Sequence, residues 1–175
     1  MLEIKRIVND VIDENTYIVI KDNCCLVIDP GSNFDDICKE INGYKLLNVL
    51  VTHSHFDHIM SVDNLKDKYK VEVLDFNNLD EKEYNIGSFT FKVIYNPGHS
   101  SDSISFYFEK DKIIFTGDFI FRESIGRYDL PTGNFSDMIK SIERIKEYDK
   151  DIVIYPGHGS KTTLGYELNN NPYIN

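Results

Sequence analysis

Four side chains that commonly bind metal ions stand close together in one short stretch of the chain. His53, His55, Asp57 and His58 lie within THSHFDHIMS, residues 52–61. The chain has five histidines, and three of them fall in this stretch. Imidazole and carboxylate groups suit zinc, manganese or iron, and a donor set without a thiolate gives no indication of copper(I) or iron–sulfur chemistry. The stretch therefore predicts a metal site.

The remaining donors each follow a separate apolar segment. His99 follows FKVIYNPG, Asp118 ends KIIFTGD and His158 follows DIVIYPG, in the same way that His53 follows LLNVLVT. The carboxyl ends of strands are where α/β proteins build sites, because rigid strands position the loop residues there. Glycines, which allow tight turns beside a ligand, accompany these donors at Gly98, Gly117 and Gly157. We therefore expect one site that contains all five histidines.

The number of donors indicates how many ions the site holds. His53 and His55 are two residues apart, so an extended segment points them the same way. Asp57 and His58 begin the next turn and helix, where they can face the same small volume from another side. With His99, Asp118 and His158 added, seven donors are too many for one tetrahedral zinc ion. They suit two ions that share a carboxylate.

The elements that must position these donors alternate between strands and helices. Periodicity and turn residues predict strands over residues 2–8, 16–21, 24–29, 46–52, 71–75, 89–95, 103–109, 112–118 and 151–157. They predict helices over 34–42, 59–69 and 135–148, the last capped by Asn134 or Ser136, with a polar tail after residue 157. This inventory indicates an α/β fold and fits either two packed sheets or one mixed sheet. At 175 residues, we expect one domain, residues 1–175.

Composition restricts the partners. The 19 Lys and Arg against 29 Asp and Glu give a net charge of −10, and no basic run is present. Both nucleic acid and anionic membranes are therefore unlikely to bind, and we expect a small-molecule substrate; the oligomeric state stays open. The amino terminus shows no signal peptide, and no apolar run is long enough to span a bilayer. The three cysteines are an odd number, and the adjacent Cys24 and Cys25 have the character of small buried hydrophobic residues, so we expect a cytoplasmic protein.

The pattern Thr-His-x-His-x-Asp-His resembles the signature of the metallo-β-lactamase superfamily. The branch that the chain resembles is hydroxyacylglutathione hydrolase (glyoxalase II) with its small single-domain relatives. ENTYIVI, VIDPGS, NPGHSSDSISFYF, FTGDFIFRESIGRYDLPTG and YPGHGSKTTLGYELNNNPYI match corresponding segments of the family, so the likeness covers nearly the whole chain. The resemblance implies an αββα four-layer sandwich, with two mixed β-sheets flanked by helices.

The resemblance also implies a role for each donor. One metal would be held by His53, His55 and His99, the second by Asp57, His58 and His158, and Asp118 would bridge them. Two divalent ions, with zinc favoured over iron or manganese, would lower the pKa of a shared water toward neutrality. The resulting hydroxide would attack the carbonyl carbon of a thioester, and Asp57 would orient it as the catalytic carboxylate.

The sequence departs from the family pattern at several positions. Met60 and Ser61 stand where glycines are usual, and Phe119 and Glu123 replace residues that are commonly Thr and small. We expect the first pair to alter helix packing and the second to alter the mouth of the pocket. The sequence ends where two-domain relatives begin the helical domain that binds most of the glutathione, so the thiol carrier stays open.

Two arginines near the site have two interpretations. Arg122 and Arg127 would anchor a substrate carboxylate, or they would pair with Glu123 and Asp129 to hold the loop.

Three other activities use a similar scaffold. A persulfide dioxygenase would use one iron, with His53, His99 and Asp118 as a two-His, one-carboxylate set, and would leave the second set of ligands empty. A lactone hydrolase would use the same machinery as a thioesterase. An oxygen reductase of the flavodiiron type is disfavoured, because it tends to have a glutamate at the position of His55 and needs a flavin domain.

Overall fold

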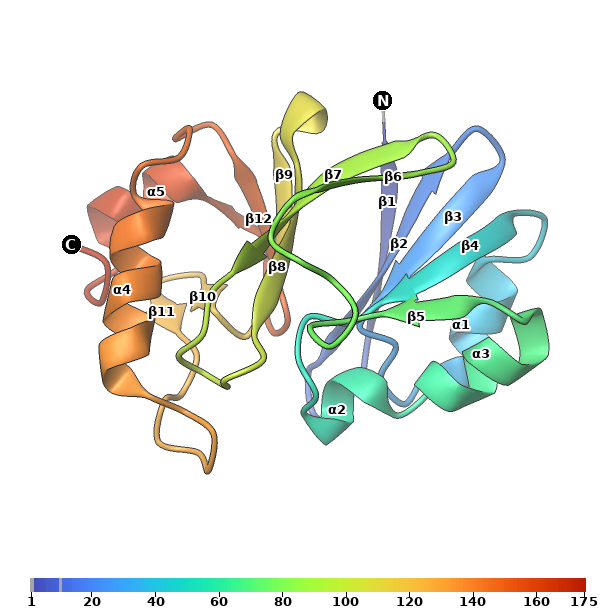
Figure 1. Ribbon diagram of the computed structural model, residues 1–175, viewed down its shortest axis with the longest axis horizontal. Coiled ribbons are helices and arrows are strands. Elements are labelled where there is room, and N and C mark those ends of the chain that lie inside the picture. The colour runs from blue at the N-terminus through green and yellow to red at the C-terminus, as the bar shows by residue number, and fades with distance from the viewer. Residues whose placement is uncertain (1, 10) are drawn as a thin grey trace.

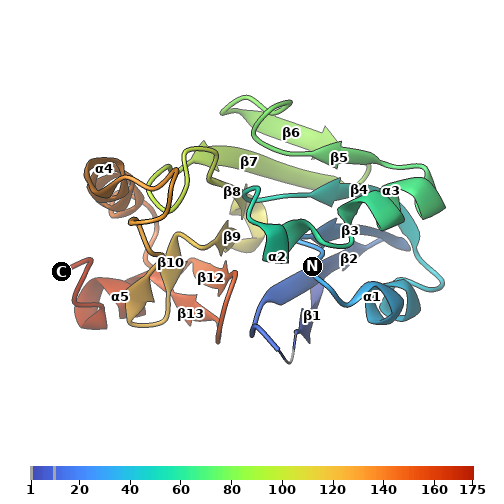
Figure 2. The ribbon, with the colours of Figure 1, turned by 90° about the horizontal axis from the view of Figure 1, so that it is seen from below.

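The computed structural model describes residues 2–9 and 11–175 as two β-sheets packed face to face, with helices outside each (Figures 1 and 2). The first half of the chain builds one sheet and the second half builds the other. The predicted four-layer αββα sandwich is therefore confirmed, and the alternative of one mixed sheet is wrong.

The first sheet has the strand order β1-β2-β3-β4-β5. Its strands are β1 (Glu3–Val8), β2 (Asn15–Lys21), β3 (Cys24–Ile28), β4 (Lys45–Leu50) and β5 (Glu72–Leu74). The first three pair antiparallel, and β3, β4 and β5 pair parallel. The parallel connections run through α1 (Phe34–Glu40) and through α2 (Phe56–Ile59) with α3 (Val62–Tyr69), which cover the outer face.

The second sheet has the order β13-β12-β9-β8-β7-β6. It contains β6 (Glu83–Ile86), β7 (Phe89–Tyr95), β8 (Ile104–Phe108), β9 (Ile113–Gly117), β12 (Val153–Pro156) and β13 (Thr162–Thr163). β9 and β12 are parallel, and the other neighbours are antiparallel. A short 3₁₀ helix (Glu109–Asp111) joins β8 to β9. The outer face is covered by α4 (Phe135–Ile145) and α5 (Leu164–Asn170), and β10 (Ile120–Phe121) and β11 (Ser124–Ile125) form a separate hairpin.

Three apolar clusters hold the layers together. The central cluster lies between the sheets and is rich in aromatic rings such as Tyr17, Phe91, Phe106 and Phe115. A second cluster packs α4 and α5 on the second sheet, and a third packs α1 and α3 on the first. Strands β2 and β8 are buried on both faces, because each lies between the central cluster and an outer one.

The predicted helices differ from the observed ones in informative ways. Asn134 caps α4, since its side chain accepts a hydrogen bond from the Asp137 N–H at 3.0 Å. The helix predicted over 59–69 is two helices, and they meet at Ser61. The Ser61 hydroxyl donates to the carbonyl of Gly31, and its N–H donates to the Pro30 carbonyl at 3.0 Å. The serine at this departure from the family pattern therefore ties the bend between α2 and α3 to the turn after β3.

The predicted polar tail after residue 157 is wrong. This segment forms strand β13 and helix α5, and Leu164 is buried in the cluster with α4. Thr163 caps α5, because its hydroxyl accepts from the Tyr166 N–H. Among the described residues, no helix combines the length and the apolar character that crossing a membrane would require.

Candidate metal centre

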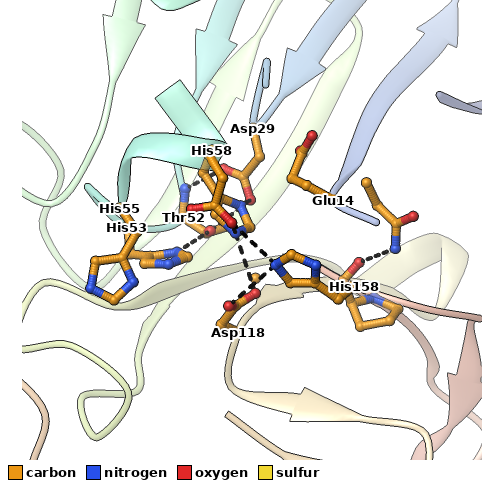
Figure 3. A network of polar contacts seen from close by, with 12 residues as sticks. Glu14, Asp29, Thr52, His53, His55, His58, Asp118 and His158 are labelled. Carbon is orange, nitrogen blue, oxygen red and sulfur yellow. Dashed lines mark hydrogen bonds and ion pairs between the residues drawn. The ribbon is translucent and has the colours of Figure 1, made fainter. Parts of the chain in front are cut away.

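Seven donor residues, from both halves of the chain, gather at one end of the two sheets. They come from the loop after β4 and the helix α2, from the ends of β7 and β9, and from the turn after β12; they are His53, His55, Asp57, His58, His99, Asp118 and His158. Figure 3 shows His58 above Asp118, with His53 and His55 on one side and His158 on the other. The strand ends thus bring all five histidines together, as expected from their positions in the sequence.

The donor atoms form three overlapping groups, within each of which they lie no more than 4.8 Å apart. These groups are His53–His55–His99, His53–His58–Asp118 and Asp57–His58–His158. The first and third groups are the two half-sites expected from the family resemblance. Asp118 contacts both of them, because its Oδ2 lies 3.5 Å from His99 Nε2 and its Oδ1 lies 3.3 Å from His58 Nε2. A carboxylate between two groups of ligands is in the place to bridge two ions.

Several of these atoms are buried without a hydrogen bond. In the described part of the chain, His53 Nε2, His58 Nε2 and Asp118 Oδ1 belong to the few buried side-chain atoms of this kind, and the last two are only 3.3 Å from each other. A buried polar atom without a hydrogen bond is costly, and its presence in a native structure calls for a water or an ion beside it. Nitrogen and carboxylate donors at this spacing fit divalent ions of the zinc or iron type. The residues present therefore fit the two ions that the fold implies.

Gly157 leaves the space that such ions need. A Cβ at this position would lie 2.2 Å from Asp118 Oδ1 and 2.7 Å from His58 Cε1. The backbone of the turn after β12 therefore approaches the donors more closely than a chain with a side chain could. Gly117, beside Asp118, has φ of +52° and adopts the left-handed conformation that glycine tolerates.

The ring nitrogens that face away from the donor cluster are held by other groups. His58 Nδ1 lies 3.1 Å from Asp29 Oδ2, while His99 Nδ1 is 2.7 Å from the Arg127 carbonyl oxygen. His158 Nδ1 lies 3.1 Å from the carbonyl of Asp13. Partners of this kind fix the tautomer and the orientation of a metal-binding imidazole, leaving the other nitrogen for the ion.

Asp29 is the residue of the site that the sequence did not single out. It is 2% exposed, and it accepts hydrogen bonds from both the N–H and the hydroxyl of Thr52 at 2.7 Å. The same carboxylate contacts His58, so it connects the end of β3 to the ligand loop. The Asp-Pro-Gly turn was visible in the sequence, but an aspartate before Pro-Gly is also an ordinary turn residue.

Burial and neighbouring charges shift the pKa values of the donors. Burial raises the pKa of Asp118, but the histidines beside it, His58 foremost, outweigh burial and hold the pKa below its usual value. Burial lowers the pKa of His53 well below its usual value, so its imidazole is neutral. The pKa of His58 is raised: burial lowers it, but the carboxylates of Asp118 and Asp29 outweigh burial. An ion bound to Nε2 of His58 must therefore displace a proton.

The two arginines proposed for substrate binding are paired in the structure. Arg127 forms a bidentate ion pair with Asp129, with N···O distances of 2.9 and 3.0 Å. The guanidinium of Arg122 lies over the ring of Tyr166, 4.6 Å from its centroid, and 3.8 Å from Glu123. This is the pairing interpretation of both residues, and their contact with a substrate stays a prediction.

Phe119 does not shape the pocket mouth, and that expectation is wrong. It is 2% exposed and packs in the cluster under α4. Glu123 accepts a hydrogen bond from the Tyr166 hydroxyl, and its N–H donates to Glu167 on α5 at 2.8 Å. Its side chain is exposed to solvent, and its effect on the pocket mouth stays a prediction.

A two-sheet αββα sandwich with a His/Asp centre at the strand ends defines a class of metal-dependent hydrolases. The chain belongs to the metallo-β-lactamase superfamily, whose family model matches residues 9–74 and 72–158. The family predicted from the sequence is therefore confirmed.

Individual relatives agree with this class. The chain is 33% identical to a probable metallo-hydrolase of Streptococcus pyogenes, an alignment that covers 99% of this chain and 91% of that protein. It is 31% identical to hydroxyacylglutathione hydrolase GloC of Haemophilus influenzae, over 85% of this chain and 86% of that one.

Solved structures with the same fold are also similar. BLEG-1 B3 metallo-β-lactamase superposes with a TM-score of 0.94 at 30% identity, covering 98% of this chain and 99% of the other. TTHA1623 in a di-iron-bound form gives a TM-score of 0.87 at 29% identity, covering 97% and 99%.

Proposed function

We propose that the protein is a dinuclear metal-dependent hydrolase that cleaves thioesters. The observation that carries the proposal is the convergence of seven donors, among which His53 Nε2, His58 Nε2 and Asp118 Oδ1 are buried without a hydrogen bond. Thioester cleavage is supported by the likeness to a hydroxyacylglutathione hydrolase across most of both chains. Zinc is the ion we propose, and the likeness to a protein that binds two irons supports iron as the other candidate.

The seven donors form two half-sites, one for each ion. His53, His55 and His99 would hold one ion, Asp57, His58 and His158 the other, and Asp118 would bridge them. The ions would supply Lewis acidity, which makes water nucleophilic near neutral pH and stabilises negative charge on a carbonyl oxygen. No serine or cysteine nucleophile is required for this chemistry.

Asp57 has a second role as the carboxylate that orients the attacking water. Its Oδ2 lies 3.3 Å from His158 Nε2 and 3.8 Å from His58 Nε2. Burial raises the pKa of Asp57, but hydrogen bonding to His158 and the charge of His58 outweigh burial, so its pKa is lowered. An ionised carboxylate has two acceptor oxygens. One of them can accept a hydrogen bond from the water and align the water with the substrate carbonyl.

The test is a comparison of three reactions by one purified protein of known metal content. Thiol release from an S-acyl thiol, ring opening of a lactone and sulfite formation from a persulfide are measured under the same conditions. We expect two metal ions per chain and thiol release as the fastest reaction. One iron per chain with sulfite production would replace the proposal with a persulfide dioxygenase, and faster lactone opening would replace it with a lactonase.

A further inference from the structure

Large apolar side chains are exposed around the metal centre. Among the described residues with such exposure, Val11 is 90% exposed, Phe56 67%, Phe135 54% and Met60 50%. Single exposed apolar residues are normal, but several at the mouth of one site mark a surface that binds an apolar group. Two of the four belong to the ligand helix, and the other two lie in or next to loops that contact His158 and His99.

Phe56 and Met60 are placed by the ligand helix itself. Phe56 is the first residue of α2 and stands between the donors His55 and Asp57. Met60 follows α2 directly, two residues after His58. His58 is fully buried, whereas Phe56 and Met60, on or next to the same short helix, are exposed to solvent beside the donors.

Val11 lies in a loop that contacts another donor, and Phe135 begins α4 directly after a second such loop. The loop between β1 and β2 contains Val11 and also Asp13, whose carbonyl oxygen lies 3.1 Å from His158 Nδ1. The loop before α4 contains Tyr128, next to the residue whose carbonyl holds His99, and the ring of Tyr128 packs on Phe135 at 4.8 Å. Figures 1 and 2 show both loops and α2 at the same end of the molecule.

A cavity of about 170 Å³, with one apolar wall, borders the ligand loop. It touches His53 and Ser54, and its apolar wall consists of Val51, Ile59, Val62, Val73 and Phe76. Apolar cavities of about 150 Å³ bind molecules of the size of benzene. The cavity is thus large enough for a short acyl chain or a ring.

The side chains around this cavity are acidic, which is unfavourable for an anionic group placed beside it. Asp102 lines this cavity, and its Oδ2 accepts from the Ser54 N–H at 3.0 Å. Burial raises the pKa of Asp102, but hydrogen bonds from Ser54 and Ser100 outweigh burial and lower it, so the carboxylate is ionised at neutral pH. Asp63 and Asp75 also line the cavity, and the whole chain has a net charge of −10.

The arginines near the site do not offset the negative charge of these acidic side chains. Arg127 is neutralised by its bidentate pair with Asp129, and Arg122 lies beside Glu123. Arg6 donates to the carbonyl of Gly159, the neighbour of His158, at 2.8 Å. Glutathione thioesters have two carboxylates and one ammonium group, so their carrier is anionic overall. The two ions would act on the thioester carbonyl, whereas the acidic side chains around the cavity would repel the anionic carrier.

We infer that the substrate is a thioester with an apolar acyl group on an uncharged thiol carrier, and that Phe56 and the cavity beside His53 contact the acyl group. This inference rests on the proposed thioester hydrolysis and specifies its substrate class.

Three matched esters separate the effects of charge and polarity. S-Hexanoyl-N-acetylcysteamine is neutral and apolar, S-hexanoylglutathione changes the carrier alone, and S-lactoyl-N-acetylcysteamine changes the acyl group alone. We expect kcat/KM for the first ester to exceed the other two by about tenfold or more, a difference of about 1.4 kcal/mol in transition-state binding. Raising the salt concentration should increase kcat/KM for the glutathione ester and leave the neutral esters unchanged.

Substitution locates the apolar contact. Phe56→Ala should raise KM for the hexanoyl ester about fivefold or more, with kcat and metal content retained. Ile139→Ala is the matched control, since Ile139 is 38% exposed on α4, one turn beyond Phe135. It should change neither constant.

The outcomes distinguish the inference from the proposed function. If S-hexanoylglutathione or S-lactoyl-N-acetylcysteamine is the best substrate, or if Phe56→Ala behaves like the control, the inference is wrong and thioester hydrolysis stands. If the metal-loaded protein cleaves none of the three esters, the proposed function fails, and the inference fails with it.

Discussion

The imidazoles of His58, His99 and His158 are each oriented by the group that the outward nitrogen contacts. Asp29 does this for His58, at 3.1 Å, and it also holds both polar groups of Thr52. Partners that orient metal ligands commonly contribute 10- to 100-fold in metal affinity. Asp29 is therefore a positioning residue for the half-site that contains His58.

Replacing Asp29 tests this role. We expect Asp29→Ala to weaken the binding of the second metal by about 10- to 100-fold. The free energy of unfolding should fall by about 1–3 kcal/mol, because the N–H of Thr52 loses its buried acceptor. Metal titration and chemical denaturation measure the two effects. Asp36→Ala, an exposed acid on α1, is the control and should change neither. Unaltered metal affinity in Asp29→Ala would remove Asp29 from the site.

The sequence predicts the metal donors better than it predicts the groups that orient them. The seven donors have the residue types and spacings that metal binding requires, and the structure brings them together. The acceptors for His99 and His158 are the backbone carbonyls of Arg127 and Asp13, and a carbonyl leaves no trace in residue type. Asp29 has the right type, but only the pairing of β3 with β4 places it beside the ligand loop.

The segment between β9 and α4 closes the second half of the site. It leaves Asp118, forms the hairpin β10–β11 and returns at Gly126, whose N–H donates to Phe119 at 3.2 Å. A Cβ on Gly126 would lie 1.7 Å from the carbonyl oxygen of Asp118 and 3.1 Å from His99 Nδ1. The backbone of this segment therefore lies in close contact with both Asp118 and His99.

A single methyl group tests that close approach. Gly126→Ala should displace the loop, reduce metal content at both half-sites and lower thioesterase activity by at least tenfold. Gly43→Ala is the control: its φ of +92° makes alanine strained, yet nothing lies within 4 Å of the added Cβ. The control should cost about 1 kcal/mol of stability and leave the metals in place. Full metal content in Gly126→Ala would contradict the role of this loop.

Four of the elements that the sequence did not predict have weak local signals. β10, β11 and β13 have two residues each, too few for any periodicity to show. Helix α5 is rich in Asn and contains Gly165, so its local propensity is weak. It forms because Leu164 is buried against α4 and because Glu167, also fully buried, accepts from the Thr162 hydroxyl at 2.5 Å. Tertiary packing, rather than local propensity, therefore makes this segment helical.

The two halves of the molecule meet at the donor cluster as well as in the central core. His53, His55, Asp57 and His58 come from the first half, and His99, Asp118 and His158 come from the second. Ions bound here would bind the folded state only, since unfolding separates the ligands. Metal binding is therefore coupled to the stability of the whole sandwich.

Removing the metals should lower the melting temperature. Occupancy at 100 times Kd stabilises a protein by about 2.7 kcal/mol, which corresponds to about 5–10 °C for a chain of this size. Differential scanning calorimetry before and after chelation measures the shift, and returning the metal should restore the original value. An unchanged melting temperature after verified removal would show that the ions do not link the halves.

Sequence periodicity could not distinguish two packed sheets from one mixed sheet. Strands β2 and β8 are buried on both faces, so their residues show no alternation that would distinguish an inner from an outer side. The family signature supplied the αββα expectation, and the burial of three separate apolar clusters confirms it.

The most direct test of the dinuclear site is the number of metal ions per chain, measured by inductively coupled plasma mass spectrometry. We predict two ions in the wild-type protein and one in His158→Ala, because that substitution removes a donor from the Asp57–His58–His158 group and leaves His53, His55 and His99 intact. One ion in the wild-type protein, or two in His158→Ala, would contradict the dinuclear site.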